Sequence, residues 1–323
     1  MRVILWGVRG SIPVPLTNNE YREKLVKVLE SAVDYGLNNK SSIMEFIDSL
    51  PMHLSYTVGG NTTCVEFISD SGKSYILDAG SGIRNLGNAL ISSPNFSPSA
   101  ELSIFLSHNH WDHISGLPFF KPLYFKGVKI NFYSCYPNQK ELLIAQMASP
   151  YFPVRFLDTA STKQFHFIDK SKNSPIQLED DLTVDTFELV HPDGSFAYRF
   201  KQNGKTFIFC TDTEFIGEVL ETKEKRNNFF HGADLLLLDA QYTIEESFYK
   251  MNWGHTSNTM AVNCAMDWGI KKLVLTHHEP DYSDSKLNEY LKDSKQHAEQ
   301  HTKQLGDSSL NIYLATEGMS FEI

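Results

Sequence analysis

The sequence predicts an α/β (α+β) fold in which two sheets pack face to face beneath outer helices. Short runs rich in Val, Ile, Phe and Tyr recur along the chain and indicate strands, and segments with helical spacing of apolar residues fall between them. The first half places strands before helices and the second half repeats this order, which is typical of two stacked sheets. Because no long Pro-, Gly- or Ser-rich linker divides the halves, we expect residues 1–323 to form one domain.

The predicted strands are runs of β-branched and aromatic residues that end at turn-forming residues. In chain order they are Val3–Trp6, Cys64–Ser69, Ser74–Leu77, Leu102–Ser107, Lys129–Ser134, Gln164–Ile168, Leu182–Val190, Phe196–Lys201, Thr206–Cys210, Leu235–Leu238, Leu273–Thr276 and Asn311–Ala315. The predicted helices carry apolar residues three or four positions apart, which places them on one helix face. These helices are Glu20–Tyr35, Ser42–Leu50, Gly82–Leu90, Asn138–Ala148, Glu214–Glu221, Ser257–Trp268 and Ser285–Leu305.

A segment between the first two predicted strands stands apart from the rest. Residues Thr17–Ser55 contain an apolar stripe at helical spacing, and its members are Leu25, Val28, Leu29, Ala32 and Val33. We therefore expect a helical insertion after the first strand. Three roles stay open for it: a helical pair packed on the body of the chain, a lid over a substrate, or a contact in a homodimer.

Composition and length describe an ordinary globular chain. Of its 323 residues, 41% are hydrophobic and 21% are charged, which is typical of folded proteins rather than disordered or fibrous ones. The longest apolar stretches fall far short of the roughly 20 residues that cross a membrane. The N-terminal residues lack the apolar core and cleavage site of a secretory signal. We therefore expect a cytoplasmic protein with no membrane partner.

The charge balance and the cysteines exclude further classes. The chain has 29 Lys and Arg against 39 Asp and Glu, a net charge of −10, and nonspecific binding to nucleic acid needs clustered cations. A nucleic-acid partner is therefore not expected. Cys64, Cys135, Cys210 and Cys264 lie far apart with no C-x-x-C pair, so we expect buried, reduced thiols rather than a zinc ribbon or redox motif.

The segment that indicates chemistry is Ser107–His113, S-H-N-H-W-D-H, which follows a predicted apolar strand. Side chains alternate along an extended chain, so His108 and His110 point the same way and can share one metal ion. If the chain then turns into a helix, Asp112 and His113 move to the neighbouring side and can hold a second ion. Imidazole and carboxylate suit zinc, manganese or iron, and these ligands alone do not distinguish the metals.

Later strands offer further ligands at their ends. His191, Asp212 and His277 each follow a predicted strand. Taken singly, His191 and Asp212 could be turn residues, and His277 could be a strand-end histidine with ordinary hydrogen bonds. Their shared placement favours a joint role in the metal site. His278 also follows the last of these strands, and spacing alone does not choose between the two histidines.

These residues resemble the metallo-β-lactamase superfamily, whose H-x-H-x-D-H signature is matched by His108, His110, Asp112 and His113. The resemblance narrows to the phosphodiesterase side of that superfamily, near the class III cyclic-nucleotide phosphodiesterases and the phosphoribosyl cyclic phosphodiesterases, and more distantly ribonuclease Z. It spans nearly the whole chain except the Thr17–Ser55 insertion. The stretches that carry it are Gly7–Pro15, Val58–Glu66, Ile76–Arg84, His110–Phe120, Thr211–Glu214, Gly254–Ser257 and Thr276–Pro280.

The resemblance implies a four-layer αββα sandwich with two divalent metal ions at one edge, zinc above all, or manganese or iron. It implies that the first ion is held by His108, His110 and His191, the second by Asp112, His113 and His277, and both by Asp212. Its implied activity is hydrolysis of a small cyclic or linear nucleotide-like phosphodiester by a hydroxide that bridges the two metals. Four metal charges, less two carboxylates and the hydroxide, leave roughly one positive charge for an anionic diester.

The leaving alkoxide then needs a proton, and His255 is the candidate donor. In ribonuclease Z-like relatives, a histidine at the matching position works with an acidic residue after the preceding strand, which here is Asp239. We therefore expect His255, Asp239 and Asp112 to take part in catalysis. Alternatively, His255 sits at a helix start and binds a phosphate or backbone group without transferring a proton.

Two further residues and several aromatic side chains are weaker candidates. We expect Asp78 to orient a metal-binding histidine, although it could simply start a turn. Asn61 could bind the phosphate or serve the tight turn that G-G-N requires. Nucleobase stacking and pocket-wall packing both stay open for the aromatic candidates, which are Trp111, Phe119, Phe120, Tyr151, Phe152, Tyr242 and Trp253.

Other functions remain open at this point. The same two-metal site could hydrolyse a carboxylic ester, thioester or lactone, because such centres also attack carbonyl groups. A metal-binding sensor without turnover is a second alternative, and an RNA-processing nuclease is a third, which the acidic charge disfavours. Among partners we expect a small phosphodiester, such as a cyclic nucleotide, and a second copy of the chain is a further candidate.

Overall fold

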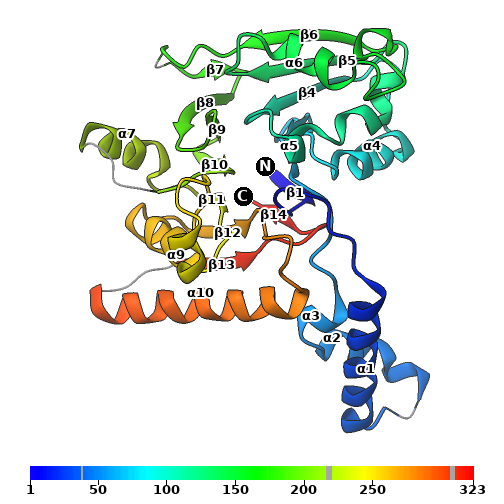
Figure 1. Ribbon diagram of the computed structural model, residues 1–323, viewed down its shortest axis with the longest axis vertical. Helices are drawn as coiled ribbons and strands as arrows, with labels where there is room; N and C mark the ends of the chain where they lie inside the picture. The colour runs from blue at the N-terminus through cyan, green and yellow to red at the C-terminus, as the bar shows by residue number, and fades with distance from the viewer. Residues whose placement is uncertain (38, 173, 216–219, 306–309) are drawn as a thin grey trace.

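The computed structural model contains two seven-stranded sheets, flanked by helices (Figure 1). It describes residues 1–37, 39–172, 174–215, 220–305 and 310–323. Both sheets mix parallel and antiparallel pairs, and the helices lie outside them. This arrangement confirms the predicted α/β sandwich.

The first sheet has the order β14-β1-β2-β3-β4-β5-β6. Its strands are β1 (Arg2–Gly7), β2 (Cys64–Ile68), β3 (Ser74–Leu77), β4 (Glu101–Leu106), β5 (Lys129–Ser134), β6 (Thr162–Phe167) and β14 (Ser320–Glu322). Strands β3 to β6 pair in parallel, whereas β14, β1, β2 and β3 pair antiparallel. The pairing of β1 with β14 brings the two ends of the chain side by side (Figure 1).

The second sheet has the order β13-β12-β11-β10-β9-β8-β7. Its strands are β7 (Ile176–Gln177), β8 (Leu182–Leu189), β9 (Ser195–Gln202), β10 (Lys205–Cys210), β11 (Leu235–Asp239), β12 (Lys272–Thr276) and β13 (Asn311–Leu314). Strands β10 to β13 pair in parallel, and β7 to β10 pair antiparallel. The inner strand β11 is buried along its whole length, as expected for a parallel strand covered on both faces.

Helices connect the strands and cover the sheets. The α-helices are α1 (Asn18–Tyr35), α2 (Ile43–Ser49), α3 (Met52–Ser55), α4 (Ile83–Ser92), α5 (Trp111–Ile114), α6 (Gln139–Gln146), α7 (Leu220–Phe230), α8 (Ile244–Tyr249), α9 (Asn258–Asp267) and α10 (Asp284–Leu305). Short 3-10 helices are Lys40–Ser42, Leu117–Phe119, Lys121–Tyr124 and Phe156–Asp158. Among the described residues, no helix has both the length and the apolar surface needed to cross a bilayer.

One predicted helix needs correction. The helix expected over Glu214–Glu221 is wrong at its start, because its first two residues are not helical, and residues 216–219 lie outside the described part of the chain; α7 follows them. The carboxylate of Glu214 accepts the backbone N–H groups of Asn252 at 3.0 Å and Gly254 at 3.1 Å. Glu214 therefore holds the loop at Asn252–Gly254 in place by hydrogen bonds and does not begin a helix.

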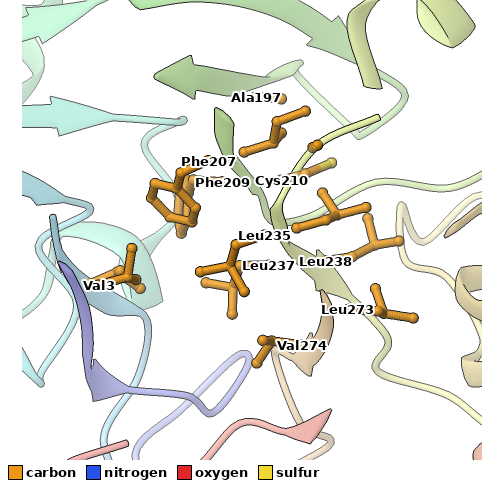
Figure 2. Close-up of a cluster of buried hydrophobic side chains, with 14 of the residues drawn as sticks. Val3, Ala197, Phe207, Phe209, Cys210, Leu235, Leu237, Leu238, Leu273 and Val274 are labelled. Carbon is orange, nitrogen blue, oxygen red and sulfur yellow. The ribbon is translucent and has the colours of Figure 1, made fainter. Parts of the chain in front are cut away.

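Two apolar clusters fill the space between the layers. The larger cluster joins the inner faces of both sheets, and Figure 2 shows Val3 of β1 near Phe207 of β10 and Leu237 of β11. The second cluster lies between the first sheet and its helices and includes Leu86 of α4 and Leu143 of α6. The four cysteines are buried and free of disulfides, as expected.

Replacing Leu237 with Ala should lower the free energy of unfolding by about 2–5 kcal/mol, because Leu237 is 1% exposed and truncation leaves a cavity between the sheets. Replacing Leu29 on α1 with Ala removes the same atoms from a side chain that is 59% exposed. This control should change stability by less than about 0.5 kcal/mol. Urea denaturation of both variants measures the difference, and equal losses would contradict this description of the core.

The insertion after β1 forms α1 to α3, which project from the rest of the chain (Figure 1). Lys24 of α1 makes an ion pair with Asp284 of α10 at 2.7 Å, which ties the insertion to the body. From the predicted apolar stripe, Val28 is half-buried, but Leu29 and Val33 are exposed. Only part of the stripe therefore packs against this chain.

Candidate metal centre

The candidate residues meet where parallel strands of both sheets end. Asp78 follows β3, His108 follows β4, Asp212 follows β10 and His277 follows β12, while Asp239 is the last residue of β11. The carboxyl ends of parallel strands are the usual place for binding sites in α/β folds, because the loops there diverge to line a crevice. The strand ends of the two sheets thus form a single site.

Several of these residues have a left-handed backbone, which is unfavourable for residues other than glycine. The φ angles are +60° at Asp78, +49° at Asp212, +62° at His277 and +63° at Ser11. This conformation turns the chain sharply at these positions. Strain of this kind persists only where the surrounding contacts hold it, and it is concentrated at functional sites.

The H-x-H-x-D-H segment folds as its spacing suggested. His110 is in extended conformation (φ −62°, ψ 152°) and caps the short helix α5, which carries Asp112 and His113. The change from strand to helix separates the side chains into two groups. Backbone N–H groups anchor this turn, including that of Ser11, which donates to Asp112 Oδ2 at 2.8 Å.

The first group contains His108, His110 and His191, with Asp212 beside them. His110 Nδ1 lies 3.0 Å from His191 Nε2. Asp212 Oδ2 lies 3.5 Å from His108 Nε2 and 3.7 Å from His191 Nε2. One candidate ligand atom from each of these residues lies within 4.8 Å of the others, close enough to share one ion.

The second group contains Asp112, His113 and His277, again with Asp212. Asp112 Oδ2 lies 3.2 Å from His113 Nε2 and 3.1 Å from His277 Nε2. Asp212 Oδ1 lies 3.1 Å from His113 Nε2 and 3.2 Å from His277 Nε2. Each carboxylate oxygen of Asp212 therefore faces a different group, which is the geometry that a bridging ligand needs.

The buried nitrogens of the site fit a divalent cation. The Nε2 atoms of His108 and His113 are buried and make no hydrogen bond, although a buried polar atom without a partner is costly. Both atoms face a carboxylate and lie among imidazoles, which are common ligands of divalent transition metals. The residues present therefore suit two cations, one in each group.

The electrostatics of the site also favour bound cations. Burial raises the pKa of Asp112 and Asp212, but the facing imidazole of His113 outweighs it, and the pKa of both carboxyls is well below the usual value. Burial lowers the pKa of His108 well below its usual value. Both carboxylates are thus negatively charged near neutral pH, while His108 is neutral and has a lone pair available for a metal.

Outer contacts hold the ligand candidates in place. Asp78 Oδ2 lies 2.7 Å from His113 Nδ1, and Asp78 also accepts the backbone N–H and hydroxyl of Ser107. Asp78 is thus placed to orient a histidine, which leaves His113 Nε2 to face the site. His191 Nδ1 donates to the carbonyl of Gly254 at 2.9 Å. A Cβ at Gly254 would lie 2.1 Å from that ring, so only glycine allows this approach.

His255 and Asp239 form a pair beside the second group. His255 Nδ1 lies 2.7 Å from Asp239 Oδ2, and Asp239 is fully buried. The same carboxylate accepts the backbone N–H groups of Thr213 and Gln241, so it is fixed in position. The ring of His255 stacks on that of His277 at a centroid distance of 4.8 Å. The pair is therefore next to the metal-ligand candidates.

Two other candidates point to structural contacts. The amide of Asn61 donates to Glu317 Oε2 at 2.9 Å, and its carbonyl oxygen accepts from Ser81 Oγ at 3.0 Å. These contacts occupy both ends of the Asn61 amide and match the turn alternative. His278 Nε2 donates to the carbonyl of Ala315 at 2.8 Å. The structure therefore directs His277 into the site and His278 toward the end of β13.

The aromatic candidates divide by exposure. Phe120 and Tyr242 are buried, so they pack inside the protein and do not offer a free face to a ligand. Trp111 is 83% exposed and follows His110 directly, and Trp253 is 59% exposed in the loop before His255. These two tryptophans lie next to site residues in the chain.

Some residues of the site were missed by sequence reasoning. Gly10 lets the loop after β1 approach His277, since a Cβ there would lie 2.5 Å from the ring. Ser11 lies in the same loop, and both belong to the quoted Gly7–Pro15 stretch, which was a signal that could have found them. Gln241 hydrogen-bonds His277, and no motif identified it.

An αββα sandwich with H-x-H-x-D-H side chains at one edge defines the class of metallo-β-lactamase fold hydrolases. The family model described as a β-lactamase superfamily domain matches residues 74–278, more than half of the chain, and the chain belongs to that superfamily. The fold implies divalent metal ions, and the two groups of ligand candidates stand at the expected edge.

Sequence relatives include ribonuclease Z proteins. The chain is 26% identical over 274 residues to ribonuclease Z of Prochlorococcus marinus strain NATL1A, covering 65% of this chain and 79% of that protein. It is 31% identical over 112 residues to ribonuclease Z of strain MIT 9313, covering 35% of this chain and 30% of that protein. The chain thus spans under a third of the length of the second relative.

Solved structures share the whole fold at low identity. Human tRNase Z, short form, has a TM-score of 0.60 at 17% identity, covering 100% of this chain and 99% of that one. A diphosphatase from the PhnP family has a TM-score of 0.60 at 18% identity, covering 100% and 97%. YhfI of Bacillus subtilis has a TM-score of 0.61 at 15% identity, covering 100% and 98%. These likenesses show the common fold.

Proposed function

We propose that this chain is a metal-dependent phosphodiesterase that hydrolyses a small cyclic or linear nucleotide-like diester. The observation that carries the proposal is Asp212, whose two carboxylate oxygens face two separate groups of ligand candidates 3.1–3.7 Å away. Paired cations are the common solution for in-line displacement at phosphorus, because they stabilise charge on the attacking and leaving oxygens.

The relatives support phosphorus chemistry. The sequence relatives bear the name ribonuclease Z, and one structure with the same fold is called a diphosphatase. The net charge of −10 disfavours a long RNA substrate and favours a small one. The rings of Trp111 and Trp253 are exposed and lie close in the chain to site residues, so they are candidate surfaces for a nucleobase.

The chain's own residues would divide the work. Divalent ions held by the two groups would polarise phosphoryl oxygens and lower the pKa of a bound water. Asp112 and Asp212 set the charge of the centre, so that it suits an anionic diester. His255 Nδ1 donates a hydrogen bond to Asp239, so Nε2 is the ring nitrogen that can face a substrate. His255 Nε2 can then give a proton to the leaving alkoxide.

Hydrolysis of bis(p-nitrophenyl) phosphate tests the proposal. Protein loaded with Zn²⁺ or Mn²⁺ should release p-nitrophenol from the diester, and the His110→Ala variant should lose that activity because one ligand of the first group is gone. A p-nitrophenyl carboxylic ester serves as the control substrate. Cyclic nucleotides and short RNA, compared at two salt concentrations, then define the substrate class.

Each outcome decides between the candidate functions. Diester turnover that is lost in the His110→Ala variant supports the phosphodiesterase. Turnover of the carboxylic ester alone would favour a carbonyl hydrolase with the same centre. Bound metal without turnover of either substrate would favour a metal-binding sensor and overturn the proposal.

A further inference from the structure

Gln241 lies between a candidate metal ligand and a carboxylate. Its side chain is 2% exposed and follows β11 by two residues. Gln241 Oε1 lies 3.2 Å from His277 Nδ1, and Gln241 Nε2 lies 2.6 Å from Glu279 Oε2. Its backbone N–H donates to Asp239 Oδ1 at 3.0 Å. One residue thus contacts both the His277 ring and the carboxylate that holds His255.

The contact with Glu279 determines which way the amide points. A carboxylate only accepts hydrogen bonds, so the group facing Glu279 must be the NH₂ of Gln241. Its carbonyl oxygen then faces His277, and since that oxygen only accepts, the proton on the ring must be on Nδ1. In the neutral ring, which is the form that can bind a metal ion, Nε2 then carries no proton, and it lies 3.1 Å from Asp112 Oδ2 and 3.2 Å from Asp212 Oδ1.

Lys250 extends the chain of contacts toward the surface. Lys250 Nζ lies 3.3 Å from Glu279 Oε1, so the ion pair uses one carboxylate oxygen and leaves the other for Gln241. The sequence of contacts is then Lys250, Glu279, Gln241 and His277. Each group has a single compatible role as donor or acceptor, which makes the arrangement self-consistent.

We propose that Gln241 is a positioning residue that fixes the ring orientation and tautomer of His277 for the second cation, and that Glu279 fixes the amide of Gln241. The proposal rests on the metal centre proposed above. The corresponding contact of His113 is the carboxylate of Asp78. A neutral amide at His277 orients the ring without adding negative charge to the second group, so the centre keeps its attraction for an anionic diester.

The Gln241→Leu variant tests the positioning role by metal binding. Titration of the metal-free protein with Zn²⁺ against a chelator of known affinity should give two ions for the wild type. In the variant, affinity for one ion should fall by about 10–100-fold, while affinity for the other ion is unchanged. If Gln241→Leu binds each ion as tightly as the wild type does, the proposal is overturned.

A matched control is available at Gln202. This glutamine is also 2% exposed, and its amide lies between Asp181 Oδ1 and the backbone N–H of Asp70. Replacing Gln202 with Leu removes the same hydrogen-bond pattern at a place away from the ligand candidates. Both metal affinities should stay unchanged in this control. A loss equal to that of Gln241→Leu would mean that general destabilisation lowers the affinity, which also overturns the proposal.

Exchanging the side chains at positions 241 and 279 distinguishes an effect on the His277 ring from a general loss of stability. The single variant Gln241→Glu sets two carboxylates against each other and should bind the second ion weakly. In the double variant Q241E/E279Q, the new carboxylate accepts from both His277 and the new amide, and affinity should return to within about threefold of the wild type. A double variant no better than the single one would reject the proposal, even if Gln241→Leu fails to fold. Wild-type protein that binds no ions would instead refute the metal centre itself.

Discussion

Replacing Asp212 with Ala should lower kcat for diester hydrolysis by about a thousandfold or more. Asp212 is 1% exposed, and its two oxygens face the two ligand groups. Without it, the histidines of both groups lose their shared counter-charge. The metal content should fall below two ions per chain, because each group loses one ligand.

The matched control for Asp212 is Asp234, which directly precedes β11, whereas Asp212 follows the end of the neighbouring strand β10. Asp234 accepts from Lys271 at 2.8 Å and from the backbone N–H of Thr206 at 2.8 Å. Its replacement by Ala removes a structural carboxylate from the same sheet and should leave kcat unchanged below the unfolding temperature. Steady-state rates and metal analysis of both variants make the comparison. An Asp212→Ala variant with two bound ions and wild-type kcat would contradict the bridging geometry.

The Asp212→Asn variant tests the charge of Asp212 and its second oxygen separately. The amide of Asp212→Asn keeps the size of the side chain but has one oxygen, so it can serve only one of the two groups. We expect such a variant to hold one ion well and to remain nearly as inactive as Asp212→Ala. The two variants together separate loss of charge from loss of the second oxygen.

The parts of the fold that sequence predicted best are those set by local pattern. The run Leu235–Asp239 is apolar over four consecutive residues, and all five residues are buried in β11. Helix α1 was expected from its apolar spacing to begin at Glu20, and it begins two residues earlier at Asn18, where Thr17 and Glu20 form a capping box. In the same way, His108, His110, Asp112 and His113 lie within six positions, so their shared place follows from one turn of chain.

The parts that sequence missed depend on distant contacts. Ser11 donates to Asp112, 101 positions away, and Gln241 bonds His277, 36 positions away. Neither residue type is unusual for a turn, so the folded chain is needed to assign the contact that each of them makes. Glu214 was expected to begin a helix. Its carboxylate instead accepts hydrogen bonds from backbone N–H groups of a distant loop, and such contacts leave no local pattern in the sequence.

Choice between neighbours also needs tertiary structure. His277 and His278 follow the same strand, and spacing treats them alike. The left-handed backbone at His277 turns one ring into the site, while the carbonyl of Ala315 binds the other. The short strand Ser320–Glu322 was missed for a similar reason, because it is defined by pairing with β1 at the far end of the chain.

Replacing His255 with Ala should slow hydrolysis of diesters with alkoxide leaving groups by about 10²–10⁴-fold. Within the Asp239–His255 pair, the imidazole ring is the part that can contact a substrate, because Asp239 is fully buried and hydrogen-bonded to His255 Nδ1. An alkoxide is a poor leaving group and needs a proton as the bond breaks. A p-nitrophenolate leaves without one, so bis(p-nitrophenyl) phosphate should be hydrolysed at nearly the wild-type rate.

The ratio of kcat for the two diesters is therefore the informative measurement. Asp239→Asn should change this ratio in the same direction, because an amide no longer enforces the proton on His255 Nδ1. Exposed His231, at the end of α7, gives the control His231→Ala, which should leave the ratio unchanged. If His255→Ala slows both diesters equally, the histidine acts on binding or on the stacked His277 ring. A selective loss with the alkoxide, in contrast, assigns proton transfer to His255, because no structural effect depends on the leaving group.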